Sequence, residues 1–171
     1  MSNNKKRIGV YAGSFNPFHV GHLDILYQAQ AVFDEVIIAV GKNPEKESNC
    51  RAPLPAKGDP KLRGSVISNY SGLLADFLNN LDYGREYHEV FLIRGLRNGD
   101  DLQYEQNQLQ FIKEMYPSLR TVFFICDKNF EHISSSALRA LRKVSEKDYL
   151  KYVLSSTPTS HFVSGMRVIG P

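Results

Sequence analysis

Hydrophobic residues gather in five short runs, and polar stretches with a few regularly spaced apolar residues separate them. The runs predict strands at 8–12, Glu35–Gly41, 65–69, 89–93 and 121–126. The second run, EVIIAVG, is rich in β-branched residues and apolar almost throughout. Strands of this kind are covered on both faces, which is the normal situation in a parallel sheet.

Helical spacing fills the gaps between these runs. In 21–33, one face collects Ile25, Leu26, Ala29, Val32 and Phe33, and in 100–115 the apolar stripe is Leu102, Leu109 and Ile112. Shorter helices are predicted at 71–79, 134–144 and 146–153. Strands alternating with helices predict an α/β fold, a doubly wound parallel sheet in a single domain.

Two segments lack such a pattern. Residues 42–64 are polar, with three prolines and two glycines, and are expected to form a loop. Residues 155–171 have no clear period, so we expect a domain over 1–154 and a C-terminal tail of unknown role.

Composition narrows the possible classes of function. Among 171 residues, 42% are hydrophobic, which excludes a disordered chain. A net charge of +3 is too mild for a nucleic-acid surface but suits small anionic substrates. Cys50 and Cys126 are far apart and are expected to be reduced thiols. No signal-peptide core or run of ~20 apolar residues is evident, so a cytoplasmic protein without membrane partners is expected.

Ligands of doubly wound sheets bind at the carboxyl ends of strands, and the segment GSFNPFHVGH follows the first strand there. Gly13 permits close backbone approach, and the helix start that follows suits phosphate. His19 and His22 are three residues apart, so both could face one pocket. The alternatives are a turn with surface histidines or a zinc site, but no further ligands lie at suitable spacing. The segment is neither a Walker A loop nor a GxGxxG fingerprint.

This segment resembles the [ST]xxxx(H/T)xGH signature of the adenylyl- and cytidylyltransferase superfamily, with Ser14 and His22 at its hydroxyl and final histidine. The resemblance implies a Rossmann-like nucleotidyltransferase fold. It also implies that His22 contacts ATP phosphates and stabilises the charge that builds up as pyrophosphate leaves. Ser14 would orient the phosphate of the acceptor, and Gly13 and Phe15 would complete the ATP contacts.

The segment RGLRNGDDLQYE directly follows the fourth predicted strand. Arg94 and Arg97 form a plausible polyphosphate clamp, because two guanidiniums flank a strand end. Glu105 falls on the apolar stripe of the next helix, and a buried carboxylate must be paired or functional. A structural ion pair with one of the two arginines is the plainer interpretation of Glu105.

The same segment is similar to the RGLRxxxDxxYE pattern of bacterial phosphopantetheine adenylyltransferases. That resemblance implies ATP contacts from Arg94, Gly95, Arg97 and Glu105, with Arg94 also close to the acceptor. SGLLADF, residues 71–77, resembles the family's helix whose leucines line the pantetheine channel, which assigns Leu73 and Leu74 to acceptor binding.

Two further motifs follow strands. Lys46, in NPEK, matches a lysine that the family uses on phosphate at the reacting centre; a solvated loop lysine is the plainer alternative, and Lys42 is a nearby rival. ISSS, residues 133–136, precedes a helix, and Arg139 on the first turns of that helix could add positive charge. Ser134, Ser135 and Ser136 could simply cap that helix, whereas the superfamily places them on the triphosphate.

The resemblance implies transfer of AMP from ATP to 4'-phosphopantetheine, giving dephospho-CoA and pyrophosphate for coenzyme A biosynthesis. The catalytic residues would be His22, Lys46, Arg97 and Ser14, with Mg²⁺ held mainly by ATP phosphates and no protein metal ligands; a homohexamer is also implied. Two alternatives stay open. Adenylylation of NMN or another phosphate is favoured by HVGH at 19–22, by the altered 42–64 loop and by Ile112, where an acceptor-contacting asparagine is expected. A nucleotide-binding regulator without turnover is the second.

Overall fold

A single five-stranded sheet organises the molecule. The computed structural model describes residues 5–42, 54, 60–62, 65–83 and 88–153. Its strands are β1 (Lys6–Gly13), β2 (Glu35–Gly41), β3 (Ser65–Tyr70), β4 (His88–Leu96) and β5 (Thr121–Ile125). All neighbours are parallel, in the order β3-β2-β1-β4-β5. The expected doubly wound α/β fold is therefore confirmed.

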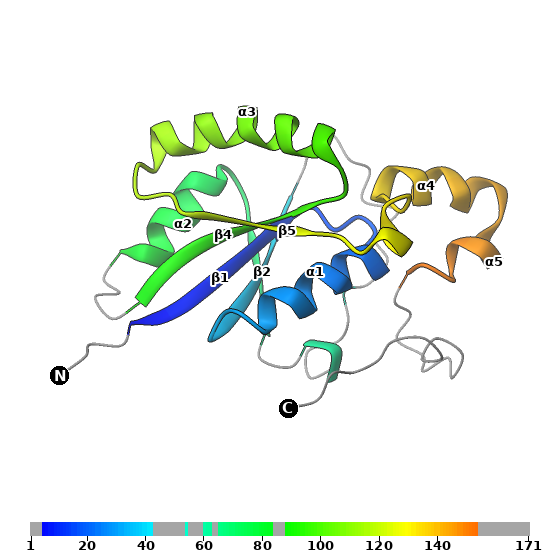
Figure 1. Cartoon of the computed structure of the whole chain (residues 1–171), viewed down its shortest axis with the longest axis horizontal. Helices are drawn as coiled ribbons and strands as arrows, with labels where there is room; N and C mark the ends of the chain where they lie inside the picture. Colours follow the sequence, from blue (N-terminus) through cyan, green and yellow to red (C-terminus); the bar gives the residue numbers. More distant parts are fainter. Residues whose placement is uncertain (1–4, 43–53, 55–59, 63–64, 84–87, 154–171) are drawn as a thin grey trace.

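Helices cover both faces of this sheet (Figure 1). They are α1 (Val20–Gln30), α2 (Leu74–Asp82), α3 (Gly99–Met115), α4 (Ser135–Val144) and α5 (Glu146–Tyr149), with 3-10 turns η2 (Pro60–Leu62) and η3 (Lys128–Phe130). Figure 1 shows α2 and α3 above the sheet and α1 below it, while α4 and α5 lie to one side. In the described part of the chain, no helix is long and apolar enough to cross a bilayer.

Alternation along β1 divides the core into two layers. Tyr11 packs with residues of α1, whereas Val10 and Ala12 pack with residues of α2 and α3 on the other face. A third cluster joins α4 to α5 through Leu138 and Tyr149. On the second face, the hydroxyl of Tyr116 donates to Asp82 at 2.8 Å and so ties the end of α3 to the end of α2.

Three predicted helix boundaries are wrong. The first helix stops at Gln30, because Ala31 is its C-cap, and Val32 is 42% exposed although the helical stripe placed it in the core. The second helix starts three residues late, because Gly72 adopts a φ of +86°, which is incompatible with a helix. The last helix ends at Tyr149, and Val153 instead forms an isolated bridge with His19.

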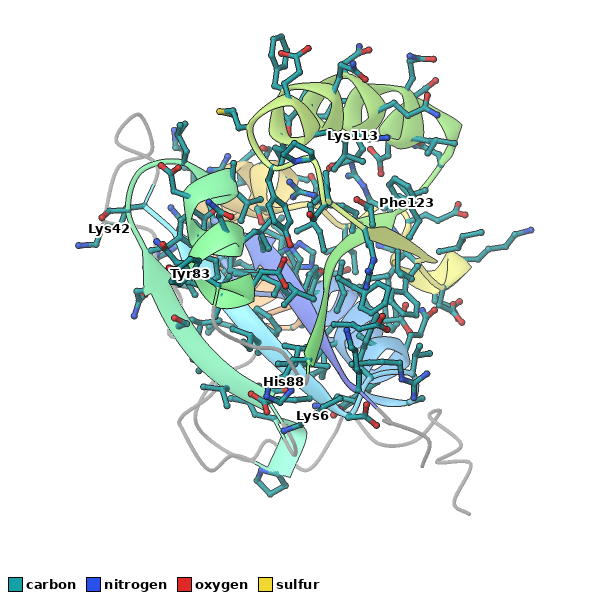
Figure 2. All side chains as sticks on the ribbon, turned by 90° about the vertical axis from the view of Figure 1, so that its left-hand side faces the viewer. Lys6, Lys42, Tyr83, His88, Lys113 and Phe123 are labelled. Atoms are coloured by element: carbon teal, nitrogen blue, oxygen red, sulfur yellow. The ribbon has the colours of Figure 1, made fainter. Side chains whose placement is uncertain are left out.

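The topological switch point lies between β1 and β4, which are neighbours in space although β2 and β3 separate them in sequence. Lys6 pairs with His88 at the start of these two strands, and Figure 2 shows the two side chains together at that end. At the other end α1 packs tightly on β4, because a Cβ on Gly95 would lie 2.8 Å from Cγ1 of Ile25. Glycine at this position lets the middle of α1 approach the end of β4 closely.

Candidate active site

A pocket opens at the switch point, where the carboxyl ends of β1 and β4 meet the starts of α1, α3 and α4. Ten residues line it: Tyr11, Ala12, Gly13, Ser14, Phe15, His22, Arg94, Gly95, Glu105 and Ser135. Eight of these were predicted as site residues from the sequence, and three separate strand-following segments contribute them. His22 and Arg94 both line this one pocket, as the sequence predicts.

The loop after β1 bends sharply around Phe15. This residue has a φ of 45°, in the left-handed region that costs a non-glycine residue about 1 kcal/mol or more. Its buried ring holds it there, since Tyr11, Phe18 and His22 surround it at centroid distances of 5.1, 5.5 and 5.1 Å. The Asn16–Pro17 peptide that follows is cis.

His19 is the N-cap of α1, and it forms a reciprocal pair with His22. Nδ1 of His19 accepts from the backbone N–H of His22 at 3.4 Å, and Nδ1 of His22 accepts from the backbone N–H of His19 at 3.3 Å. A neutral imidazole whose Nδ1 accepts a hydrogen bond carries its own hydrogen on Nε2. The first turn of α1 therefore sets the tautomer of both rings.

Both histidines are neutral in this environment. Burial first, and then the charges of His19 and Arg97, hold the pKa of His22 well below its usual value. Burial and the Arg97 guanidinium lower the pKa of His19 to about 4. At neutral pH His22 therefore acts as an Nε2–H donor and not as a cation.

Arg94 is fixed on two sides. Its Nη1 donates to the carbonyl of Ala12 at 3.2 Å, and its Nε lies 3.1 Å from Oε2 of Glu105. Both side chains are largely buried, at 15% and 17% exposure. The plainer interpretation of Glu105, an ion pair with one of the arginines, is thus realised. The contact between these two atoms lacks hydrogen-bond geometry. Within the described chain, neither Nε of Arg94 nor Oε2 of Glu105 has a hydrogen-bond partner.

Arg97 does not line the pocket. Asp101 holds its Nε and Nη2 at 2.9 and 2.7 Å and also accepts from its backbone N–H at 2.9 Å. Hydrogen bonding from Arg97 lowers the pKa of Asp101. The arginine still acts on the site electrostatically, because its charge lowers the pKa of both His19 and His22.

The three serines at the start of α4 have different positions. Ser134 is the N-cap and accepts from the N–H of Ala137 at 3.1 Å, so the capping interpretation holds for it. Ser135 lines the pocket and donates to the carbonyl of Pro17 at 3.1 Å. Ser136 lies off the pocket wall and accepts from Arg139 at 2.9 Å.

Arg139 binds the loop after β1. Its Nη1 donates to the carbonyl of Asn16 at 2.6 Å, across 123 positions of sequence. Together with the bond from Ser135 to Pro17, this contact fastens α4 to that loop. The guanidinium that the sequence suggested as extra charge therefore serves the shape of the pocket.

The predicted acceptor half of the site is less complete. Leu73 is the N-cap of α2 and is 53% exposed, while Leu74 packs against the core on that face; neither lines the pocket. Ile112 is buried in the same core. Lys42 is exposed at the end of β2, and Figure 2 shows it pointing outward. Lys46 and the 155–171 tail lie outside the described residues.

Tyr11 and Ala12 line the pocket although the sequence did not single them out. Ala12 contributes the carbonyl that holds Arg94. The signal for Tyr11 was present: its phenol is the one polar side chain in the run IGVYAG, two positions before Gly13. A polar group so close to the carboxyl end of a central strand is a candidate for ligand contact.

Comparison with known proteins agrees with this geometry. The model of the cytidylyltransferase-like family matches residues 10–141. The phosphopantetheine adenylyltransferase of Mycoplasma mycoides is 35% identical over 146 residues, covering 79% of this chain and 96% of that protein. The one of Haemophilus ducreyi is 36% identical over 136 residues, covering 77% and 81%.

A solved structure also shares the fold. The nicotinic acid mononucleotide adenylyltransferase of Plasmodium falciparum, complexed with NaAD, superposes with a TM-score of 0.59 over 86% of this chain and 90% of that one. Its sequence identity is 15%, so the likeness concerns the fold alone. From the family match and the curated relatives together, the chain belongs to the cytidylyltransferase-like nucleotidyltransferases, in the family of the phosphopantetheine adenylyltransferases.

Proposed function

We propose that this protein transfers AMP from ATP to 4'-phosphopantetheine, giving dephospho-CoA and pyrophosphate. The observation that carries the proposal is the convergence of Ser14, His22 and Arg94 on one pocket at the switch point. These residues come from the two motifs that resemble the family, and the curated relatives above bear the name of this activity.

The reaction needs positioning and charge stabilisation, and no covalent intermediate. A phosphate oxygen of the acceptor attacks the α-phosphorus of ATP. The bond from that phosphorus to the bridging oxygen of the β-phosphate breaks in line, and pyrophosphate carries away the negative charge. His22 would donate its Nε2–H to the phosphate oxygens that gain charge, and Arg94 would neutralise them from the other side.

The other predicted residues differ in how close they lie to the pocket. Ser14 would orient the attacking phosphate from the loop after β1, and Glu105 on α3 and Ser135 on α4 would contact the nucleotide. Arg97 would contribute its charge from beside the pocket. Lys46, Leu73 and Leu74 stay proposed contacts of the acceptor.

Mg²⁺ is proposed to enter with the triphosphate. This ion prefers oxygen ligands, keeps several waters and needs few protein groups. Among the described residues that line the pocket, Glu105 is the one carboxylate, and it is paired with Arg94, which fits an ion held mainly by phosphates. When bound, the ion would neutralise charge on the phosphate oxygens.

Pyrophosphate release tests the proposal. The protein is incubated with MgATP and either phosphopantetheine or NMN. We expect release with phosphopantetheine, whereas release with NMN alone would overturn the assignment in favour of the second candidate. Nucleotide binding without release from either acceptor would indicate a regulator. The homohexamer, also a proposal, is tested by light scattering, which should give six times the mass of the chain.

A further inference from the structure

Tyr11 is the pocket residue for which neither the motifs nor the reaction above provides a role. It lies on β1 and faces α1, and it is 5% exposed. Its ring meets Phe15 and His22 edge-on, at centroid distances of 5.1 and 6.3 Å. The phenol thus borders the loop and the histidine that form the phosphate-seeking side of the pocket.

No hydrogen bond joins the hydroxyl of Tyr11 to a described residue, and the hydroxyl is not among the fully buried polar atoms that lack a partner, so it keeps contact with solvent. Buried tyrosines normally find a partner for this group, because burying an unpaired hydroxyl costs about 1–3 kcal/mol. Tyr116 shows the normal case, since its hydroxyl donates to Asp82 at 2.8 Å. The hydroxyl of Tyr11 instead meets its hydrogen-bonding requirement from outside the protein, although the rest of the side chain is buried.

The surroundings of the phenol show which end of the molecule it faces. Asp24, Arg94 and Cys126 are close enough for their charges to influence its pKa, and they lie on α1, at the end of β4 and just after β5. Those elements meet at the carboxyl end of the sheet. Tyr11 also lines the pocket, so the solvent that its hydroxyl can reach is the solvent of that cavity.

The phenol keeps its proton at every working pH. Burial raises the pKa of Tyr11 well above its usual value, the nearby thiol of Cys126 adds to the increase, and the charge of Arg94 opposes it. The group is therefore an O–H donor and never a phenolate. A donor beside His22 and Arg94 matches an anionic oxygen.

We propose that Tyr11 is an additional nucleotide-binding residue, whose hydroxyl donates a hydrogen bond to a phosphate oxygen of the bound ATP. The inference rests on the nucleotide half of the proposed function and is independent of the acceptor. The chain supplies three donors of different character to one polyphosphate: the neutral Nε2–H of His22, the charged Arg94 and the neutral phenol.

The variant Tyr11→Phe removes the hydroxyl and keeps the ring that packs on Phe15. We expect its Kd for MgATP, measured by titration calorimetry without any acceptor, to rise about tenfold, which is typical for a hydrogen bond to a charged group. We expect its melting temperature to stay at the wild-type value, because no bond within the protein is lost. The affinity for adenosine, which has no phosphate, should not change.

Tyr116→Phe is the matched control, because it removes a hydroxyl that has a protein partner and lies outside the pocket. It should lower the melting temperature and leave the Kd for MgATP unchanged. Tyr11→Phe should therefore weaken MgATP binding without changing the melting temperature, and Tyr116→Phe should lower the melting temperature without changing MgATP binding.

Three results would overturn the inference. They are a Kd for MgATP within twofold of wild type in Tyr11→Phe, a lower melting temperature in that variant, and an equal loss of affinity for adenosine and ATP. A failed pyrophosphate assay is a separate matter: if Tyr11→Phe weakens MgATP binding while neither acceptor releases pyrophosphate, the role of Tyr11 stands and the proposed acceptor does not.

Discussion

The imidazole of His19 lies flat against that of His22, with ring centroids 3.6 Å apart, and each Nδ1 accepts the backbone N–H of the other residue. Because of this reciprocity, the same pair of hydrogen bonds caps α1 and orients His22. The stacked ring of His19 restricts rotation of His22, and the helix start fixes which nitrogen of His22 carries hydrogen. His19 is thus a positioning residue in this pocket.

His19→Asn and His19→Ala separate capping from direct contact with a ligand. Asparagine can accept from the N–H of His22 as a good N-cap does, whereas alanine cannot, so His19→Ala should lose about 1 kcal/mol more unfolding free energy than His19→Asn. Urea denaturation measures this difference. Turnover should follow the same order, with His19→Asn the more active. Equal and severe loss of turnover in both variants would show that the imidazole itself contacts substrate.

Stability should fall as the solution is acidified from pH 6.5 towards pH 4. Above an ordinary histidine pKa of 6.5, both the folded and the unfolded states hold His19 neutral. Below pH 6.5, His19 binds a proton in the unfolded chain, whereas in the folded state it stays neutral until about pH 4. This group alone should cost on the order of 3 kcal/mol over that range.

Urea denaturation at several pH values checks this dependence, and His22 should add to it in the same direction, since its pKa is also lowered. His19→Asn should flatten the profile, because the group whose pKa is lowered is removed. A wild-type profile with no slope between pH 6.5 and 4 would contradict the neutral histidine pair.

His22→Ala should lower turnover by about 10²–10³, the usual cost of removing one preorganised donor, while ATP still binds. Steady-state rates of pyrophosphate release and calorimetric binding of MgATP measure the two effects separately. Near-normal turnover in this variant would exclude His22 from the reaction.

Asp101→Asn should weaken turnover about fivefold to tenfold, because it removes the two-point grip on Arg97 and the charge that balances it. Its exposed neighbour provides the control, since Asp100→Asn removes the same charge from the first turn of α3, and the ion pair of Arg97 is with Asp101. Similar rates in the two variants would show that the grip on Arg97 is unimportant for the site.

Arg139→Met should raise the KM for ATP severalfold, because the carbonyl of Asn16 loses the donor that holds the loop after β1. Arg142→Met, on the same helix but paired with Glu146, should leave the KM at the wild-type value. If Arg139→Met instead lowers kcat with the KM unchanged, the arginine acts on the transition state and not on the loop.

The central strands were predictable because they are short apolar runs, as in EVIIAVG, and burial on both faces requires that composition. The edge strand β3, SVISNY, is less apolar and only partly buried, so its pattern was weaker. Helix ends were harder. The stripe through Ile25 and Ala29 continues formally to Val32, yet the helix stops at Gln30. Spacing alone does not report where a cap interrupts the period, nor that the backbone at Gly72 is left-handed.

The site was predictable as a set of segments and not as a set of contacts. Strand ends located Ser14, His22 and Arg94 correctly, because a parallel sheet gathers its carboxyl ends at one edge. Which of the serines 134–136 faces the pocket depends on the start of α4, and the sequence allowed all three. The grip of Asp101 on Arg97 requires both side chains in place.

The bond from Ser135 to Pro17 joins residues 118 positions apart, and it has a consequence for biogenesis. A ribosome makes the loop after β1 almost at once, but the helix that braces it emerges when most of the chain has already been synthesised. A nascent chain that ends before α4 could assemble its five strands and still lack one wall of the pocket. The pocket is therefore completed late in synthesis, when α4 has emerged and Ser135 can bond to Pro17.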